Sequence, residues 1–191
     1  KEPLQTEERT LEVEADVPLN ALYKAYQMCD RIHQDYYSID LLSDILGRGE
    51  SSRLYQALVK NEQIFSSISA SLIGSFETGL FLITGFLAEG VTFEEGEIAL
   101  EKNLEQIKTE FVQEEELFKV KNQAESSIIF SQIELLERCS SLAYGALLGN
   151  LNLVNEESGQ LQKVQKEDIL KAAQTVLRKE NCSTLYYKSK K

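Results

Sequence analysis

The alternation of apolar and polar residues predicts strands in several parts of the chain. Residues 10–17 place Leu, Val and Ala between acidic residues, which predicts a half-buried strand with an acidic outer face. Residues 80–87 are apolar almost throughout, so we expect a central strand covered on both faces. Together with the strand before it and the turn 74–79, this strand is expected to form a hairpin. The predicted strands are 10–17, 21–28, 65–73, 80–87 and 181–187.

Apolar residues that recur every three to four positions predict the helices. Asp35 is expected to cap the first one, and Thr92 with Glu95 three residues later forms a capping-box pattern. A kink is expected near residue 131, and 150–159 is interpreted as a linker with a short turn. The predicted helices are 35–46, 52–60, 93–112, 114–130, 131–148 and 166–177.

The stretch 41–70 combines a helix, a glycine turn, a second helix and a strand. Gly47 and Gly49 bracket the turn, where glycine tolerates the backbone conformation needed beyond a helix end. Ser51 or Ser52 is expected to cap the second helix by accepting a backbone N–H bond. Inward and outward positions follow from the spacing. Leu54 and Leu58 face in, with Val59 as a further candidate for that face, and Arg53, Gln56 and Lys60 face out.

The order of these elements predicts an α+β fold. Two strands, two helices, a hairpin, further helices and a closing strand favour two layers, a mostly antiparallel sheet with helices packed on one face. No repeat or long linker divides the chain, so we interpret 1–191 as a single domain.

Composition excludes some functions. The chain is 42% hydrophobic and 27% charged, as is typical of globular proteins, and no apolar run is long enough to span a membrane. A formal net charge of −11 argues against nucleic-acid binding. Cys29, Cys139 and Cys182 form no metal or disulfide pattern, although one bridge stays open. Unpaired thiols favour the cytoplasm, and a periplasmic location also stays open.

The residues alone assemble no catalytic site. His33 could act as a general base oriented by an aspartate, but its polar loop favours a solvated histidine. One histidine and three scattered cysteines make no zinc site. The acidic groups 94–97 and 114–116 sit at helix starts, where they complement the helix dipole. We therefore expect a binding or structural domain, or half of a composite enzyme.

Several motifs, in this order, resemble one family. LLSDILGRGESSRLYQALVKNEQIFSSISA, the preceding DYY and the following GLFLITGF resemble the second-half domain of pitrilysin/insulinase-type zinc metallopeptidases, a group that includes mitochondrial processing peptidase subunits. The EEEL…VKN helix start and the late KEDI helix are similar too. The resemblance covers about residues 11–187 and implies the LuxS/processing-peptidase-like metallohydrolase fold.

This resemblance implies a function for a larger protein. In the family, a first half carries zinc through an inverted HxxEH motif, and the second half closes a chamber that holds the substrate peptide. No HxxEH motif occurs here, so the chain is expected to be the C-terminal half and inactive alone. It is expected to hold no cofactor, with zinc on an N-terminal catalytic domain that would be its partner. Peptide or unfolded polypeptide is the implied substrate, and homo-oligomerisation stays open.

One departure from the family concerns substrate binding. Active members often carry an arginine and a tyrosine seven residues apart that grip the substrate, and alignment on SSRLY places them at Val59 and Ser66. Neither residue matches, so contacts are expected from Arg53, Tyr55 or Lys60 instead. The alternative is a non-catalytic peptide-binding or assembly subunit of the same fold.

Overall fold

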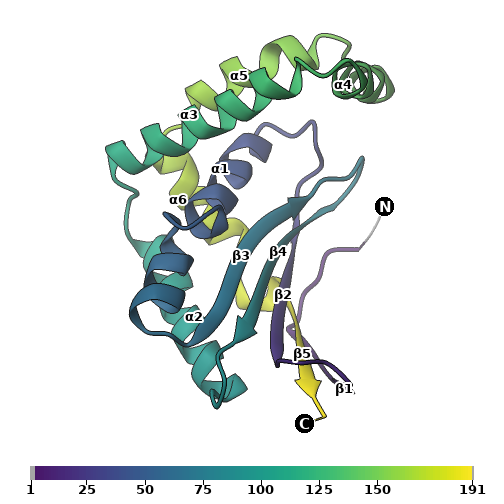
Figure 1. The fold of residues 1–191 in the computed structure, drawn as a ribbon. Helices are drawn as coiled ribbons and strands as arrows, with labels where there is room; N and C mark the ends of the chain where they lie inside the picture. Colours follow the sequence, from purple (N-terminus) through teal and green to yellow (C-terminus); the bar gives the residue numbers. More distant parts are fainter. Residues whose placement is uncertain (1–2, 191) are drawn as a thin grey trace.

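A layer of helices covers one face of a twisted sheet in the computed structural model, which describes residues 3–190 (Figure 1). This arrangement confirms the predicted α+β class. The strands are β1 (Arg9–Ala15), β2 (Ala21–Met28), β3 (Phe65–Ile73), β4 (Gly79–Leu87) and β5 (Cys182–Ser189). The helices are α1 (Tyr36–Gly47), the π-helix η1 (Tyr55–Asn61), α2 (Phe93–Thr109), α3 (Glu114–Ser131), α4 (Leu135–Leu147), α5 (Leu153–Lys163), α6 (Lys166–Val176) and the 3-10 turn η2 (Lys179–Asn181).

The sheet has the order β1-β5-β2-β4-β3. Three of its pairs are antiparallel, β2 with β4, β2 with β5 and β3 with β4, whereas β1 and β5 run parallel. The C-terminal strand therefore lies between the two N-terminal strands. This order leaves β1 at one edge. Leu11 there is largely exposed, against expectation, but Val13 and Ala15 are half-buried and the acidic residues between them are exposed, so the predicted half-buried strand with an acidic outer face is confirmed from Val13 onward.

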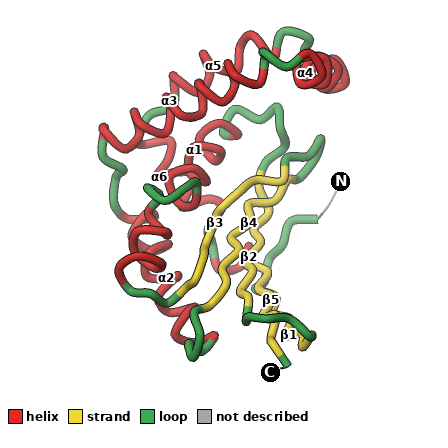
Figure 2. The backbone as a smooth tube through the Cα atoms, viewed as in Figure 1, coloured by secondary structure: helices red, strands yellow, loops and turns green. Residues whose placement is uncertain are grey.

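Strand β4 is central but covered on one face only. Phe81, Ile83 and Leu87 point into the core, whereas Leu80 and Phe86 on the other face are exposed. The predicted cover on both faces is therefore wrong. The helices lie on a single side of this sheet (Figure 2), and an antiparallel sheet can leave its second face to water.

The core lies between the sheet and the helices α1 and α6. Helix α1 packs on β3 and on α6, and α6 also reaches β2. Leu41, Leu42 and Leu46 of α1 are fully buried because their spacing puts them on one helix face. Asp35 is the N-cap residue of α1, but its side chain makes no cap bond and instead pairs with Lys171, so the predicted cap is wrong.

Helices α3, α4 and α5 lie beyond α1 (Figure 1). The predicted linker 150–159 is wrong over most of its length, because α5 begins at Leu153. Residues 150–159 are mostly polar and gave no helical pattern, because the buried residue of α5, Leu161, lies beyond the predicted linker. Among the described residues, no helix combines the length and apolar character that crossing a bilayer would require.

Candidate functional site

The glycine turn between α1 and η1 is set by close packing. A Cβ atom on Gly47 would lie 1.8 Å from the backbone nitrogen of Ala70 in β3, so only glycine lets the helix end approach this strand. Gly49 has a φ of 74°, in the left-handed region that favours glycine. The two glycines therefore have different roles, close approach and backbone conformation. Together they direct the chain from α1 into η1.

The serines after the turn do not act as predicted. The Ser52 hydroxyl donates to the carbonyl oxygen of Gly49 at 2.7 Å, so it closes the turn instead of capping the helix. The N-cap residue of η1 is Leu54, which makes no side-chain cap bond. The Ser51 hydroxyl lies 3.1 Å from the Lys119 ammonium on α3. The predicted serine cap is therefore wrong.

Three backbone irregularities follow within a few residues. The helix expected here as α is a π-helix, and the Glu62 N–H donates to the Ala57 carbonyl at 2.9 Å across its end. Gln63 then has a φ of 56°, and the β3–β4 register shifts between Phe65 and Ser67. π-Helical turns and β-bulges are over-represented at functional sites. The π-helix contains Val59 and the register shift surrounds Ser66, the two positions where the resemblance places the arginine and tyrosine that hold the substrate.

Arg53 is held by a carboxylate of the same chain. Its Nε donates to Oε1 of Glu116 at 3.0 Å, and its Nη2 donates to Oε2 at 2.6 Å. Glu116 lies in the first turn of α3, so this two-pronged pair ties the start of η1 to α3. The Arg53 guanidinium is therefore already paired, and a substrate carboxylate would have to compete with Glu116.

The remaining predicted contact residues lie on the same segment. Tyr55 is half-buried and Lys60 is exposed on η1, while Val59 packs against the core. The Ser66 hydroxyl donates to the Phe86 carbonyl at 3.1 Å across the hairpin. Peptide binding by Arg53, Tyr55 and Lys60 stays a prediction.

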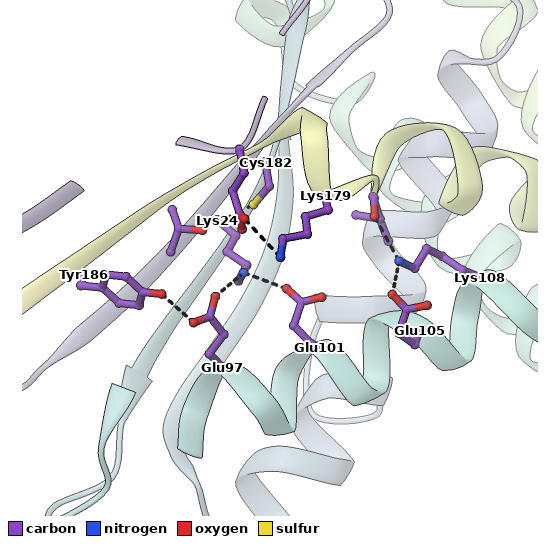
Figure 3. Close-up of polar contacts among 11 residues, drawn as sticks. Lys24, Glu97, Glu101, Glu105, Lys108, Lys179, Cys182 and Tyr186 are labelled. Carbon is purple, nitrogen blue, oxygen red and sulfur yellow. Dashed lines mark hydrogen bonds and ion pairs between the residues drawn. The ribbon is translucent and has the colours of Figure 1, made fainter. Parts of the chain in front are cut away.

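A polar cavity of about 390 Å³ lies on the helix side of the sheet, between α2 and strands β1, β2 and β5. At its floor, the Lys24 side chain is only 2% exposed, and its Nζ lies 2.7 Å from both Glu97 and Glu101 (Figure 3). The Tyr186 hydroxyl donates to the second oxygen of Glu97 at 2.6 Å. We call these four residues the Lys24 cluster.

The ionisation of the Lys24 cluster follows from its contacts. Burial alone would lower the pKa of Lys24, but hydrogen bonds to Glu101 and Glu97 outweigh it and raise this pKa. Burial likewise opposes the charge of Glu97, yet its bonds with Lys24 and Tyr186 bring its pKa below the ordinary value. Burial and Glu97 raise the pKa of Tyr186 to about 12. At neutral pH the Lys24 ammonium and the Glu97 carboxylate are therefore both charged, and the Tyr186 hydroxyl keeps its proton and donates it to Glu97.

Sequence reasoning missed this cluster, although a signal was present. Lys24 occupies an inward position of the alternating strand β2, between Leu22 and Tyr26. Glu97 and Glu101 are four residues apart and share a face of α2. Glu97 was expected only to complement the helix dipole, and its principal contacts are instead with β2 and β5.

His33 is exposed to solvent, and the described residues form no metal-binding group. The His33 ring is exposed, and its Nδ1 accepts the Asp35 backbone N–H at 3.1 Å. Across residues 3–190, no group of three or more His, Cys, Asp or Glu side chains could hold a metal ion. The three cysteines are free, with Cys29 half-buried, Cys139 exposed and Cys182 buried.

Comparison with known proteins assigns the family. A model described as the peptidase M16 inactive domain matches residues 1–124, so the chain belongs to the peptidase M16 inactive-domain family. This result confirms the resemblance to the second half of these zinc peptidases. Among proteins with curated descriptions, none matches the chain by sequence.

Solved structures share the fold. A protease from Helicobacter pylori superposes with a TM-score of 0.92 at 23% identity, covering 98% of this chain and 46% of that one. The inactive peptidase domain of a protein assigned as a zinc protease in Bordetella parapertussis has a TM-score of 0.81 at 19% identity, covering 90% and 93%. A chain of complex III2 from Candida albicans has a TM-score of 0.78 at 14% identity, covering 92% and 44%. The chain thus spans about half the length of the H. pylori protease.

Proposed function

We propose that this chain is the substrate-chamber half of a zinc metalloendopeptidase. The observation that carries the proposal is its membership of the inactive-domain family over residues 1–124. Zinc, its ligands and the catalytic glutamate would lie on an N-terminal partner domain. There the metal would activate water for peptide hydrolysis. This half would close the chamber and contact the substrate.

The segment from η1 into β3 is the proposed contact surface. Strand β3 is at the end of the sheet, with only β4 beside it among the described strands, so an extended peptide could pair along it. The exposed Lys60 would meet acidic or carbonyl groups of that peptide, and Tyr55 would offer a ring to its side chains. Val59 and Ser66 stand where active family members often carry the arginine and tyrosine that hold the substrate. We therefore expect this half alone to bind peptide weakly.

A binding titration tests this contact surface. Fluorescence anisotropy of labelled, unfolded casein should show saturable binding to the 191-residue chain, weakened several-fold by Lys60→Glu. Lys179→Glu is the matched control, because this lysine is also exposed but lies next to Glu8 beside β1. Equal losses in the two variants would reduce the effect to net charge and contradict a site at η1. Metal-dependent cleavage of casein by this chain alone would contradict the proposal that the zinc site lies on a separate N-terminal domain.

A second candidate function is a non-catalytic assembly or peptide-binding subunit. The likeness to a chain of complex III2 supports it at the level of the fold. The two candidates differ in the N-terminal half of the full-length protein. An intact HxxEH motif there, with zinc-dependent cleavage of casein, supports the enzyme, and a degenerate motif with binding alone supports the subunit.

A further inference from the structure

Side chains of helix α3 hold the turn that leads into η1. Besides the two-pronged ion pair described above, the Lys119 ammonium donates to the carbonyl oxygen of Ser51 at 3.2 Å and lies 3.1 Å from its hydroxyl. Nη2 of Arg48 donates to the Ser127 hydroxyl at 2.7 Å. We call these contacts the α3 clamp, made of Glu116, Lys119 and Ser127 on α3 with their partners Arg53, Ser51 and Arg48.

The clamp residues of α3 share one face of that helix. At about 100° per residue, positions 116, 119 and 127 fall within about 80° of one another around the helix axis. The same helix buries Leu117, Val120 and Ala124 and packs on α1, which ends at the turn. The clamp therefore fastens residues 48–53 to a helix that is itself anchored in the core.

The start of η1 depends on these contacts for its direction. Arg48, Gly49 and Ser51 are exposed, so burial contributes little to fixing the turn. Leu54, the N-cap residue, has no polar group that could cap the helix. Leu54 and Leu58 are fully buried, but apolar burial is non-directional. The polar contacts to α3 therefore supply the fixed geometry.

The Arg53–Glu116 pair is the most specific contact of the clamp. The two side chains are 24% and 20% exposed, and the two parallel hydrogen bonds fix the orientation of the guanidinium as well as its distance. An exposed pair with a single bond would contribute little. Because Nε and Nη2 of Arg53 already face Glu116, the edge of the guanidinium that best fits a carboxylate is occupied.

We propose that Arg53 is a positioning residue, which orients η1 and the start of β3 through the α3 clamp and does not itself contact the peptide. Tyr55 and Lys60, which follow on η1, would then be the contact residues. This inference rests on the proposed function for the role of the surface that is positioned. The positioning itself does not require a bound peptide.

Binding of labelled, unfolded casein separates a positioning role from a contact role. Glu116→Ala breaks the pair, frees the Arg53 guanidinium and removes one negative charge. A positioning role predicts that Glu116→Ala and Arg53→Ala each weaken binding by at least about threefold, and that the double variant is no weaker than either, because both remove the same contact. Unchanged or tighter binding by Glu116→Ala would show that the freed guanidinium can contact the peptide, and would overturn the proposal.

Hydrogen exchange measured by mass spectrometry tests the clamp without any peptide. The amides of residues 54–66 should exchange at least about fivefold faster in Glu116→Ala and in Arg53→Ala, whereas those of β2 and β5 should keep their rates. Glu114→Ala is the matched control, because Glu114 also lies in the first turn of α3 but pairs with Lys166 of α6 at 3.0 Å. Unchanged exchange over 54–66 in the Glu116 and Arg53 variants, or an equal increase in the control, would overturn the proposal.

The two experiments distinguish this inference from the proposed function. If the unsubstituted chain binds no casein while residues 54–66 exchange faster in both clamp variants, the peptide-binding proposal fails and the positioning of η1 by α3 stands. If the chain binds casein and exchange is unchanged, the contact surface stands and the clamp fails. Circular dichroism of every variant checks that the fold is intact.

Discussion

Replacing Lys24 by methionine tests how the Lys24 cluster stabilises the fold. Methionine fills the space of the lysine stem, but it leaves the carboxylate of Glu97 facing a cavity without its cation. Breaking a buried pair by removing one partner costs about 3–5 kcal/mol. Glu97 and Glu101 here are 29% and 41% exposed, so water compensates them in part. We therefore expect Lys24→Met to lower the free energy of unfolding by about 2–3 kcal/mol.

Urea unfolding followed by circular dichroism measures this loss. The slope with denaturant should stay the same, so the change appears in the midpoint. The triple variant Lys24→Met, Glu97→Gln, Glu101→Gln should recover most of the stability, because it leaves no uncompensated charge. The comparison of single and triple variants separates lost charge compensation from lost packing.

The pH dependence gives a second readout. Since the pKa of Glu97 is lowered in the folded protein, its contribution is present above its unfolded pKa of about 4.5 and is lost as pH falls through the folded pKa. The loss in Lys24→Met should therefore shrink below about pH 4. A loss below about 0.5 kcal/mol at pH 7, or a triple variant less stable than the single one, would refute the reasoning.

Three further predictions concern stability and thiol reactivity. Burial raises the pKa of Asp40 to about 6, so the folded state binds this proton more tightly and stability falls as pH rises from about 4 to 6. Asp40→Asn should thus stabilise the chain at pH 8 by about 1–2 kcal/mol in urea unfolding, and an equal gain at pH 4 would contradict this cause. Gly47→Ala should lower the free energy of unfolding by at least about 3 kcal/mol, since the new Cβ atom would clash with the β3 backbone. Gly49→Ala should lower it by only about 1 kcal/mol, since the Cβ atom there has open space and the only cost is the positive φ. Exposed Cys139 should react with a thiol reagent in the native state well before Cys182, whose pKa burial raises, and equal rates would contradict the burial of Cys182.

Local patterns determined most of the elements. Residues 65–73 form a strand with the predicted bounds because alternation and flanking polar residues are local signals. The Thr92 capping box is also confirmed, with the Thr92 hydroxyl accepting the Glu95 N–H at 3.2 Å and the Glu95 carboxylate accepting the Thr92 N–H at 2.9 Å. Both partners of this motif lie within one helical turn, so a short window of sequence contains all of its physics.

Only the tertiary structure decided which elements meet. Strand β5 pairs with β1 and β2 across most of the chain length, and this pairing leaves β1 exposed at an edge. The partners of Lys24 come from α2, and Glu116 of α3 occupies the guanidinium of Arg53. These contacts join residues far apart in sequence, so periodicity cannot specify them. Periodicity shows that a side chain has an inward or outward face, and the packing of distant segments determines what that face touches.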